Sequence, residues 1–302
     1  MGATKIEWAE AVWNPVTGCT PISAGCEHCY ARRMAQRLAG RNGYPKKDPF
    51  NVTVHYDRLQ EPQHWKKPRR IFVCSMGDLF HSHVSEQVIF QVFSTMMDCP
   101  WHTYLILTKR PERMKRILNR SYWWGRTAIP IPQNIWLGVT VENQEQAEAR
   151  ISWLLETLAA VRFVSYEPAL GAADFRFALA NLNWVICGGE TGPGARPMHP
   201  AWARGVRDQC QAAGVPFFFK GWGDWAPRCG NLYGSGNDYT ILDPDCKKWA
   251  CVRFGENGRN TRDLANMIGA GEEIYMQRVS KRRAGRLLDG VEHNAMPKGA
   301  RG

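Results

Sequence analysis

The feature that most restricts the fold is a rhythm of short apolar runs, each followed by polar residues and often by a segment with helical periodicity. The runs cover residues 71–75, 104–108, 135–140, 161–166, 184–187 and 215–220. Helical patterns follow at 86–97, 111–118 and 144–158, and an earlier apolar run covers 11–16. Short runs that are apolar throughout indicate parallel strands buried on both faces.

Together these runs predict about seven parallel strands and an α/β fold, a partial or complete (β/α) barrel. No G-x-G-x-x-G follows any run, which argues against a dinucleotide-binding sheet. The rhythm stops after residue 220. We therefore predict a barrel core over residues 1–220. Residues 221–302 are predicted to form a loop-rich lid and a basic C-terminal segment, both packed on the barrel.

Polar residues follow every predicted strand, at the edge where a barrel of this kind gathers its functional side chains. They are Ser75 and Asp78; Thr108, Lys109 and Arg110; Thr140, Glu142 and Asn143; Ser165, Tyr166 and Glu167; Gly188, Gly189 and Glu190; and Lys220 and Trp222. Some of them, such as Thr108 and Asn143, are equally well explained as helix caps. The set as a whole predicts one polar mouth.

A loop with three cysteines precedes the first predicted helix, which begins near Tyr30 and ends near Gly40. Six residues separate Cys19 from Cys26, and two separate Cys26 from Cys29. Three thiolates on one loop can bind three irons of a cubane cluster and leave its fourth iron open for chemistry. Two alternatives are a zinc knuckle with a distant fourth ligand and three unrelated buried cysteines.

The chain has seven other cysteines. Cys74, Cys99, Cys187 and Cys210 lie in or beside apolar segments, which predicts small core residues. A looser group in a glycine-rich region leaves a second metal site open; its members are Cys229, Cys246 and Cys251.

Charge and hydropathy bear on partners and compartment. No apolar run approaches the roughly 20 residues of a membrane helix, and the N-terminus has no apolar signal region. We therefore expect a cytoplasmic protein that does not enter a membrane. The net charge of +11 favours a polyanionic partner such as DNA, although a merely basic protein would show the same charge.

Several motifs combine into one resemblance. They are Trp13-Asn14-Pro15-Val-Thr17-Gly18-Cys19, Gly25-Cys26-x-x-Cys29-Tyr30, Glu167-Pro168, Gly188-Gly189-Glu190-x-Gly192 and the ending Gly285-Arg-Leu-Leu-Asp-Gly290. The set resembles a branch of the radical S-adenosylmethionine (SAM) superfamily that is common in bacteriophages. The usual cysteine spacing in that superfamily is three then two, so the first arm is longer here.

The resemblance implies a [4Fe-4S] cluster on Cys19, Cys26 and Cys29, a bound SAM, and an external reductant such as flavodoxin or dithionite. It also implies a 5′-deoxyadenosyl radical that acts on a base, in the cytoplasm of an infected cell if the chain is phage-encoded. Phage members are linked to hypermodified thymidines, which implies isomerisation of a glycyl-thymidine type of base in DNA. The scarcity of further C-x-x-C pairs also favours a redox-neutral reaction.

Two other functions stay open: a radical SAM enzyme acting on a peptide or small metabolite, and a zinc-stabilised nucleic-acid-binding protein without catalysis. Under the radical SAM interpretation, three sets of residues receive roles. The candidate SAM contacts are Ser75, Asp78, Thr108, Thr140, Glu142, Asn143 and Glu190. The candidate substrate contacts are Lys109, Arg110, Lys220 and Trp222, and the candidate catalytic residues are Tyr166 (as hydrogen donor), Lys109 and Glu167.

Overall fold

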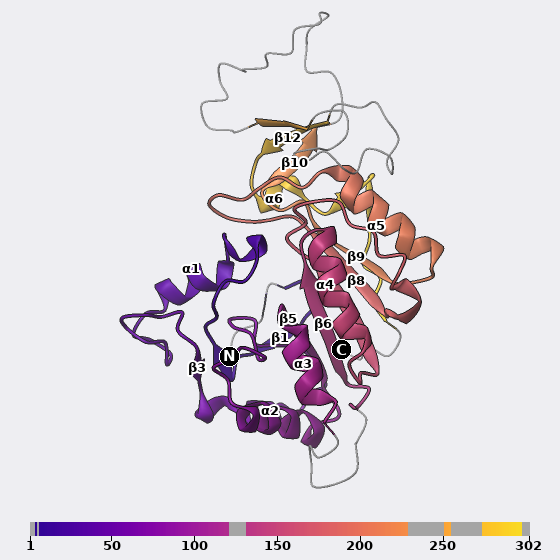
Figure 1. The fold of residues 1–302 in the computed structure, drawn as a ribbon. Helices are drawn as coiled ribbons and strands as arrows, with labels where there is room; N and C mark the ends of the chain where they lie inside the picture. Colours follow the sequence, from indigo (N-terminus) through magenta and orange to yellow (C-terminus); the bar gives the residue numbers. More distant parts are fainter. Residues whose placement is uncertain (1–3, 5, 121–130, 229–250, 255–273, 298–302) are drawn as a thin grey trace, which may run out of the picture.

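A computed structural model describes residues 4, 6–120, 131–228, 251–254 and 274–297. Its main element is a curled sheet of seven parallel strands whose spatial order follows the chain (Figure 1). The strands are β1 (Ala11–Trp13), β4 (Arg70–Val73), β5 (Thr103–Thr108), β6 (Ile135–Val141), β7 (Val161–Tyr166), β8 (Trp184–Gly188) and β9 (Phe217–Gly221). The predicted partial (β/α) barrel and its seven strands are confirmed.

The first predicted strand is shorter than the apolar run suggested. The chain leaves β1 after Trp13, and β2 (Val16–Thr17) pairs instead with β3 (Thr53–Val54) in a separate antiparallel ladder. Pro15 lies between the two strands, and proline has no backbone N–H to donate to a ladder. The break turns the chain away from the sheet just before the first cysteine.

Helices join the strands and cover the outer face of the sheet (Figure 1). They are α1 (Tyr30–Arg37), α2 (Glu86–Asp98), α3 (Pro111–Leu118), α4 (Gln144–Leu155), α5 (Pro200–Ala212) and the short α6 (Lys281–Ala284). The predicted helices at 30–40, 86–97, 111–118 and 144–158 are confirmed, although α4 ends at Leu155. The sequence analysis missed α5, which Pro200 starts at its first turn and whose buried face holds Trp202, Val206 and Cys210.

The two faces of the sheet carry different cores. The outer face packs aliphatic side chains against the helices, and the four cysteines predicted to be core residues are all buried there. The inner face is an aromatic layer that includes Trp8, Phe72, Trp136, Phe163 and Trp184. This layer lines the inside of the half-barrel.

The end of the described chain covers the last strand of the sheet. Phe219 N donates to His293 O at 2.8 Å, and Ala295 N donates to Phe217 O at 3.2 Å. Ala295 O also accepts from the indole of Trp184 at 2.8 Å. The basic C-terminal segment thus pairs with the free edge of β9, which an exposed parallel sheet would otherwise present to solvent.

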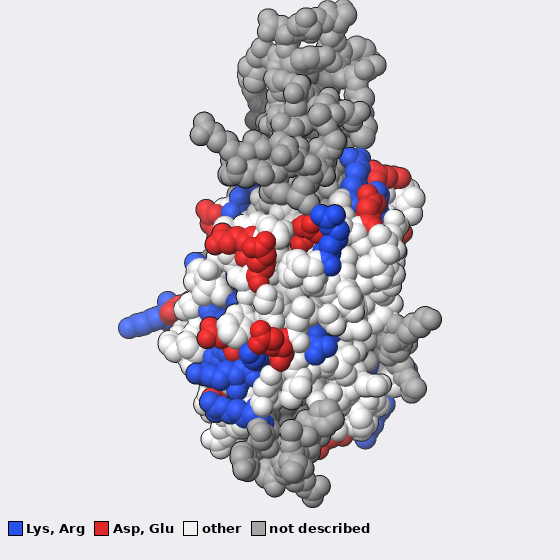
Figure 2. Space-filling view, turned by 45° about the vertical axis from the view of Figure 1, so that its right-hand side comes forward, with Lys and Arg blue, Asp and Glu red and all other residues white. Residues whose placement is uncertain are grey.

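The region after β9 is described in part. β10 (Trp225–Arg228), β12 (Ile274–Arg278) and β11 (Cys251–Phe254) form a small antiparallel sheet, and β13 (Leu287–Leu288) pairs with β14 (Val291–Glu292). Most of the predicted lid, 221–262, lies outside the described residues. None of the helices formed by the described residues is both long and apolar enough to cross a membrane. Figure 2 shows basic and acidic side chains interspersed on one face of the molecule.

Candidate active site

The three cysteines lie on one loop between β2 and α1. Cys19 follows β2 by one residue, Cys26 ends the short 3-10 helix η1 (Ala24–Cys26), and Cys29 directly precedes α1. All three are half-buried thiols outside any disulfide. The loop therefore presents three thiols from the same side of the fold.

Gly18 fixes where this loop starts. Its φ is +83°, and a Cβ at this position would lie 2.1 Å from the carbonyl oxygen of Asn51. Its N–H donates to Met76 O at 2.8 Å, just beyond the carboxyl end of β4. A residue with a side chain could take neither the conformation nor the space, so glycine is required here.

A buried carboxylate, Glu142, supports the loop from behind. Ser23 Oγ donates to Glu142 Oε1 at 2.8 Å, Arg150 Nη1 lies 3.0 Å from Oε2, and Lys109 Nζ lies 3.5 Å from Oε1. A Cβ on Gly25 would lie 2.4 Å from Glu142 Oε1. The two cations offset the cost of burying the carboxylate, and the missing side chain at Gly25 lets the loop rest directly on it.

Arg196 ties the same loop to the residues after β8. Its guanidinium binds both carboxylate oxygens of Glu190, at 2.9 and 2.7 Å. It also binds Glu27 Oε2 and Ala24 O, each at 2.9 Å. The hydrogen bond to Glu190 raises the pKa of Arg196, which favours the charged guanidinium that makes these contacts.

The first cysteine is held by a second ion pair. Arg110 Nη1 lies 3.2 Å from Cys19 Sγ and 2.9 Å from Asp78 Oδ2. Asp78 is buried and also accepts from Thr108 Oγ1 at 2.8 Å and from the backbone N–H of Lys109 at 3.3 Å. Asp78 thus orients Arg110 toward the thiol from the ends of two neighbouring strands.

The thiols differ in acidity. Burial raises the pKa of the Cys19 thiol to about 11, and the Asp78 carboxylate adds to the rise. Burial also opposes ionisation of Cys26, but the Lys109 ammonium and hydrogen bonds from Ile22 and Ser23 outweigh it and lower the pKa of this thiol. Because the thiolate is the metal ligand, the lowered pKa favours metal binding at Cys26 over Cys19.

Three half-buried thiols on one loop fit an iron–sulfur cluster, in which each thiolate binds its own iron. Within the parts of the chain that the structure describes, no three His, Cys, Asp or Glu side chains come together as ligands of a single metal ion. A tetrahedral zinc site with Zn–S bonds of about 2.3 Å would bring its sulfurs within about 4 Å of each other. In a cubane each thiolate binds its own iron, so the cysteines stand farther apart.

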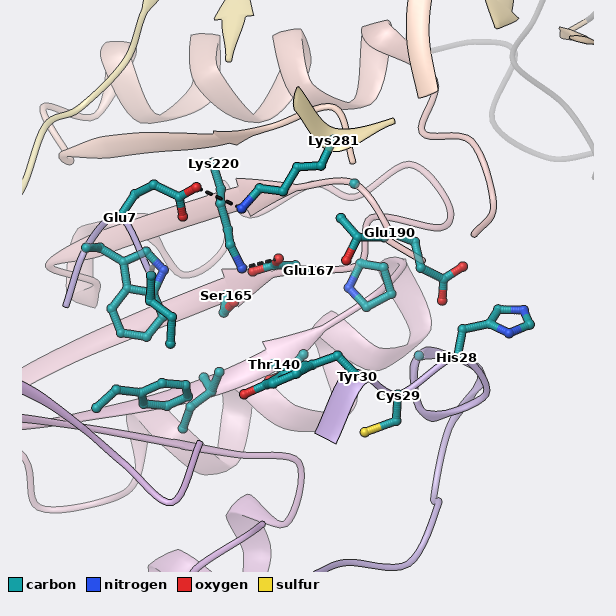
Figure 3. Close-up of a pocket in the computed structure, with 18 of the residues that line it drawn as sticks. Glu7, His28, Cys29, Tyr30, Thr140, Ser165, Glu167, Glu190, Lys220 and Lys281 are labelled. Carbon is teal, nitrogen blue, oxygen red and sulfur yellow. Dashed lines mark hydrogen bonds and ion pairs between the residues drawn. The ribbon is translucent and has the colours of Figure 1, made fainter. Parts of the chain in front are cut away.

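A pocket of about 390 Å³ opens beside the loop, above the aromatic layer (Figure 3). Strands β4 to β9 and the segments that follow them form its walls, as the barrel prediction required. The pocket is lined by Ile6, Glu7, Trp8, Gly25, His28, Cys29, Tyr30, Phe72, Leu107, Lys109, Thr140, Ser165, Glu167, Pro168, Gly189, Glu190, Thr191, Lys220 and Lys281.

Two lysine–carboxylate pairs cross this pocket. Lys220 Nζ lies 2.5 Å from Glu167 Oε1, and Lys281 Nζ lies 2.8 Å from Glu7 Oε1. Figure 3 shows Glu7 and Lys281 at one end, and His28 and Cys29 at the other. The pocket therefore has a cysteine end and a far end, with the Lys220–Glu167 pair between them.

The structure brings some of the predicted residues to the pocket and places others behind it. Lining it are Cys29, Lys109, Thr140, Glu167, Glu190 and Lys220. Ser75, Asp78, Thr108, Arg110, Glu142 and Asn143 lie behind the loop or at strand ends. Asn143 caps α4, since its Oδ1 accepts from Gln146 N at 3.0 Å. Ser75 bonds to Asn14 Oδ1 at 3.2 Å.

Tyr166 and Trp222 face away from the pocket. Tyr166 is fully buried on the outer face of the sheet, donates its hydroxyl to Gly171 O and packs edge-on against Phe175. Neighbouring residues of a strand face opposite sides, so Ser165 lines the pocket and Tyr166 does not. The indole of Trp222 donates to Leu287 O at 2.9 Å. Neither side chain is among those that line the pocket.

Sequence reasoning missed five residues that shape the site: Glu7, Trp8, Ser23, Arg196 and Lys281. Lys281 was recognised only as part of a basic segment. Ser23 lies inside the cysteine loop, but its position in the sequence does not indicate that its side chain contacts Glu142. The open question of a second metal at Cys229, Cys246 and Cys251 falls outside the described side chains.

Comparison with known proteins places the chain in a family. The family model of DUF5131, described as a protein of unknown function, matches residues 3–297. No curated protein matches. Two solved structures are similar in fold. Spore photoproduct lyase complexed with dinucleoside spore photoproduct is 10% identical, with 94% of this chain and 72% of that chain covered and a TM-score of 0.45. A mutant of spore photoproduct lyase is 10% identical, with 77% and 68% covered and a TM-score of 0.42. Because the family match spans nearly its whole length, this chain belongs to the DUF5131 family.

Proposed function

We propose that the chain is a radical SAM enzyme that modifies a nucleic-acid base, most specifically a thymidine that carries an amino acid. One observation supports this more than any other. The three-cysteine loop borders a pocket at the carboxyl ends of a parallel half-barrel, above the aromatic layer, and Cys29 lines that pocket. A cluster on these thiols would open onto the space where a substrate binds.

In the proposal, Cys19, Cys26 and Cys29 hold a [4Fe-4S] cluster. When bound and reduced by an external donor such as flavodoxin, such a cluster supplies the electron that converts SAM into methionine and a 5′-deoxyadenosyl radical. The chain's own task is to keep the three thiols in place. Arg110 bonds to Cys19, and the Glu142 and Arg196 contacts hold the loop on either side of Cys26.

SAM would bind at the cysteine end of the pocket. Thr140 and Glu190 both line the pocket, and Figure 3 shows Glu190 on the same side as His28. The other predicted SAM contacts act in this proposal through the groups they position. They are Ser75, Asp78, Thr108, Glu142 and Asn143. The aromatic layer below the pocket excludes water from the reacting atoms.

The proposed reaction is an isomerisation in which a hydrogen atom is removed from the amino-acid α-carbon and later returned. The bond from nitrogen to the thymine methylene is exchanged for one from carbon, so atoms and electrons balance within the substrate. Lys109 and Lys220 line the pocket and would hold the substrate carboxylate, while Glu167 keeps the Lys220 ammonium in position.

Product mass tests this reaction. Reconstituted enzyme, SAM and dithionite are incubated with DNA or a nucleoside that carries N-linked glycine on the thymine methylene. An isomerase yields a product of unchanged mass with altered retention and fragmentation. A product lighter by two hydrogens, or heavier by a methyl group, would exclude isomerisation.

The cluster itself is tested by substitution. Cys19→Ala, Cys26→Ala and Cys29→Ala should each abolish stable iron binding after anaerobic reconstitution, because each thiolate holds one iron. Cys74→Ala and Cys187→Ala are matched controls, since both thiols are buried away from the loop and should leave the iron content unchanged. A colourless wild-type protein with stoichiometric zinc would contradict the proposal.

A further inference from the structure

The far end of the pocket holds two buried polar atoms without a partner. The side chain of Trp8 is 2% exposed, yet its Nε1 donates to nothing. Glu7 Oε2 is likewise buried and accepts nothing. Other buried indoles of the same fold are satisfied: Trp13 donates to Arg58 O at 2.8 Å and Trp184 to Ala295 O at 2.8 Å.

An unpaired buried donor or acceptor costs free energy, so native proteins rarely leave one without a function or a ligand. Here the two orphaned atoms belong to neighbouring residues that line the same pocket. One offers an N–H and the other a carboxylate oxygen. A ligand that satisfies both must carry an acceptor and a donor.

The surroundings hold these two groups in place. Lys281 takes the other oxygen of Glu7 at 2.8 Å, which fixes the carboxylate and leaves Oε2 for a ligand. The Trp8 ring packs against Phe72 with centroids 4.8 Å apart and an interplanar angle of 60°. Ile6, Phe72 and Leu107 line the pocket alongside. The far end is therefore an apolar slot with two polar groups available.

We infer that Glu7 and Trp8 are the specificity-determining residues that recognise a cyclic amide edge of the substrate. Trp8 Nε1–H donates to a ring carbonyl, and Glu7 Oε2 accepts the adjacent ring N–H. This inference rests on the proposed function and adds to it the residues that select the base. It places the amide edge at the far end, and the opposite side of the ring toward Cys29.

A ring amide fits this pair better than a peptide does. A peptide bond is almost always trans, so its N–H and C=O point in opposite directions and cannot both reach one side. A ring forces the amide to be cis and presents both groups along one edge. The apolar side chains of the slot suit the flat faces of such a ring.

Binding measurements on the anaerobically reconstituted protein with SAM test the assignment. The probes are thymidine, 3-methylthymidine (which lacks the ring N–H) and N-acetylglycine N′-methylamide as a linear amide with trans secondary amides. We expect wild type to bind thymidine roughly tenfold more tightly than 3-methylthymidine, the effect of one lost hydrogen bond to a buried charged acceptor. The linear amide should not compete.

Two variants locate the effect in the protein. Trp8→Phe keeps an aromatic ring but removes the donor, and should weaken thymidine binding roughly five- to tenfold. Glu7→Gln lets Lys281 take the amide oxygen, and should abolish the preference for thymidine over its methylated form. Trp153→Phe and Glu145→Gln, both on the outer helix α4, are matched controls that should bind as wild type.

The outcomes separate the two proposals. Equal wild-type affinity for thymidine and 3-methylthymidine, or competition by the linear amide, would overturn the inference even if a variant fails to fold. Unchanged thymidine affinity in both variants would overturn it as well. Iron content and reductive SAM cleavage in the same wild-type samples report separately on the radical SAM function.

Discussion

At Gly25, the absence of a Cβ atom lets the cysteine loop lie against a buried carboxylate. The nearest group to its missing Cβ is the carboxylate of Glu142, which also accepts from Ser23 and faces Arg150 and Lys109. The loop therefore rests against a charged side chain that cannot move without leaving its cations. Residues between two ligands are as constrained here as the ligands themselves.

Gly25→Ala should consequently disrupt the loop. A methyl group 2.4 Å from Glu142 Oε1 must displace either the loop or the buried ion pair, so we expect iron content after reconstitution to fall by more than half. Gly205→Ala is the control, because nothing lies within 4 Å of a Cβ added there. That variant should keep its iron and gain about 0.5–1 kcal/mol in stability from helix propensity. Full iron content in the Gly25 variant would show that the loop adapts.

At the scale of elements, α5 carries a titrating cap. His199 is the N-cap, and its Nδ1 accepts from Ala201 N at 3.1 Å. Burial, assisted by the nearby Arg204, lowers the pKa of His199 to about 4. The folded state thus binds this proton less readily than the unfolded state, whose histidine titrates near 6.5.

The cap should make stability depend on pH in a defined direction. Because the folded pKa is the lower one, the contribution is complete above pH 6.5 and is lost as the pH falls toward 4. Between pH 7 and pH 5 the loss amounts to roughly 1–2 kcal/mol. His199→Asn keeps a capping acceptor but does not titrate. In urea denaturation at both pH values, the variant should lose less stability than wild type; an equal loss in both proteins would refute the assignment.

The strands and helices show which features could be predicted from the sequence and which could not. Most strands were recognisable as short, mainly apolar runs, because a parallel strand in this fold is buried on both faces. Helix α5 was not recognised, since Gly205 in its interior weakens the helical pattern, although Pro200 at its first turn is a residue that starts helices. The cysteines were found because their spacing is local. Trp8 and Lys281 were not, because only the closed fold brings them to one pocket.

At the scale of the whole molecule, the chain has a net charge of +11, and Figure 2 shows basic side chains interspersed with acidic ones on one face. Part of it is already paired inside the site, as for Lys281 with Glu7. Lys66 and Lys67 are exposed in the connection before β4, and Arg282 is exposed on α6 next to the pocket-lining Lys281. These are the side chains most available to DNA phosphates.

DNA affinity should therefore fall steeply with salt, with a slope of log K against log salt of about −0.9 per phosphate contact. Replacing Lys66 and Lys67 by Gln, or Arg282 by Gln, should reduce the slope by about one for each contact removed. Lys115→Gln is the control, because Lys115 lies over the Trp153 ring and pairs with Glu156 on the outer helices. Absence of duplex binding at low salt in an anaerobic titration would instead indicate a free nucleotide substrate.

The ion pair between Glu7 and Lys281 joins positions 274 residues apart in the chain. Translation delivers the cysteine loop long before the lysine. On the ribosome, a nascent chain therefore exposes its three thiols before the opposite wall of the pocket exists. An oxygen-sensitive cofactor loaded at that stage would face open solvent, whereas one loaded after chain release would enter a site already walled on both sides. For the proposed cluster, this order of synthesis favours insertion after Lys281 has joined the pocket wall.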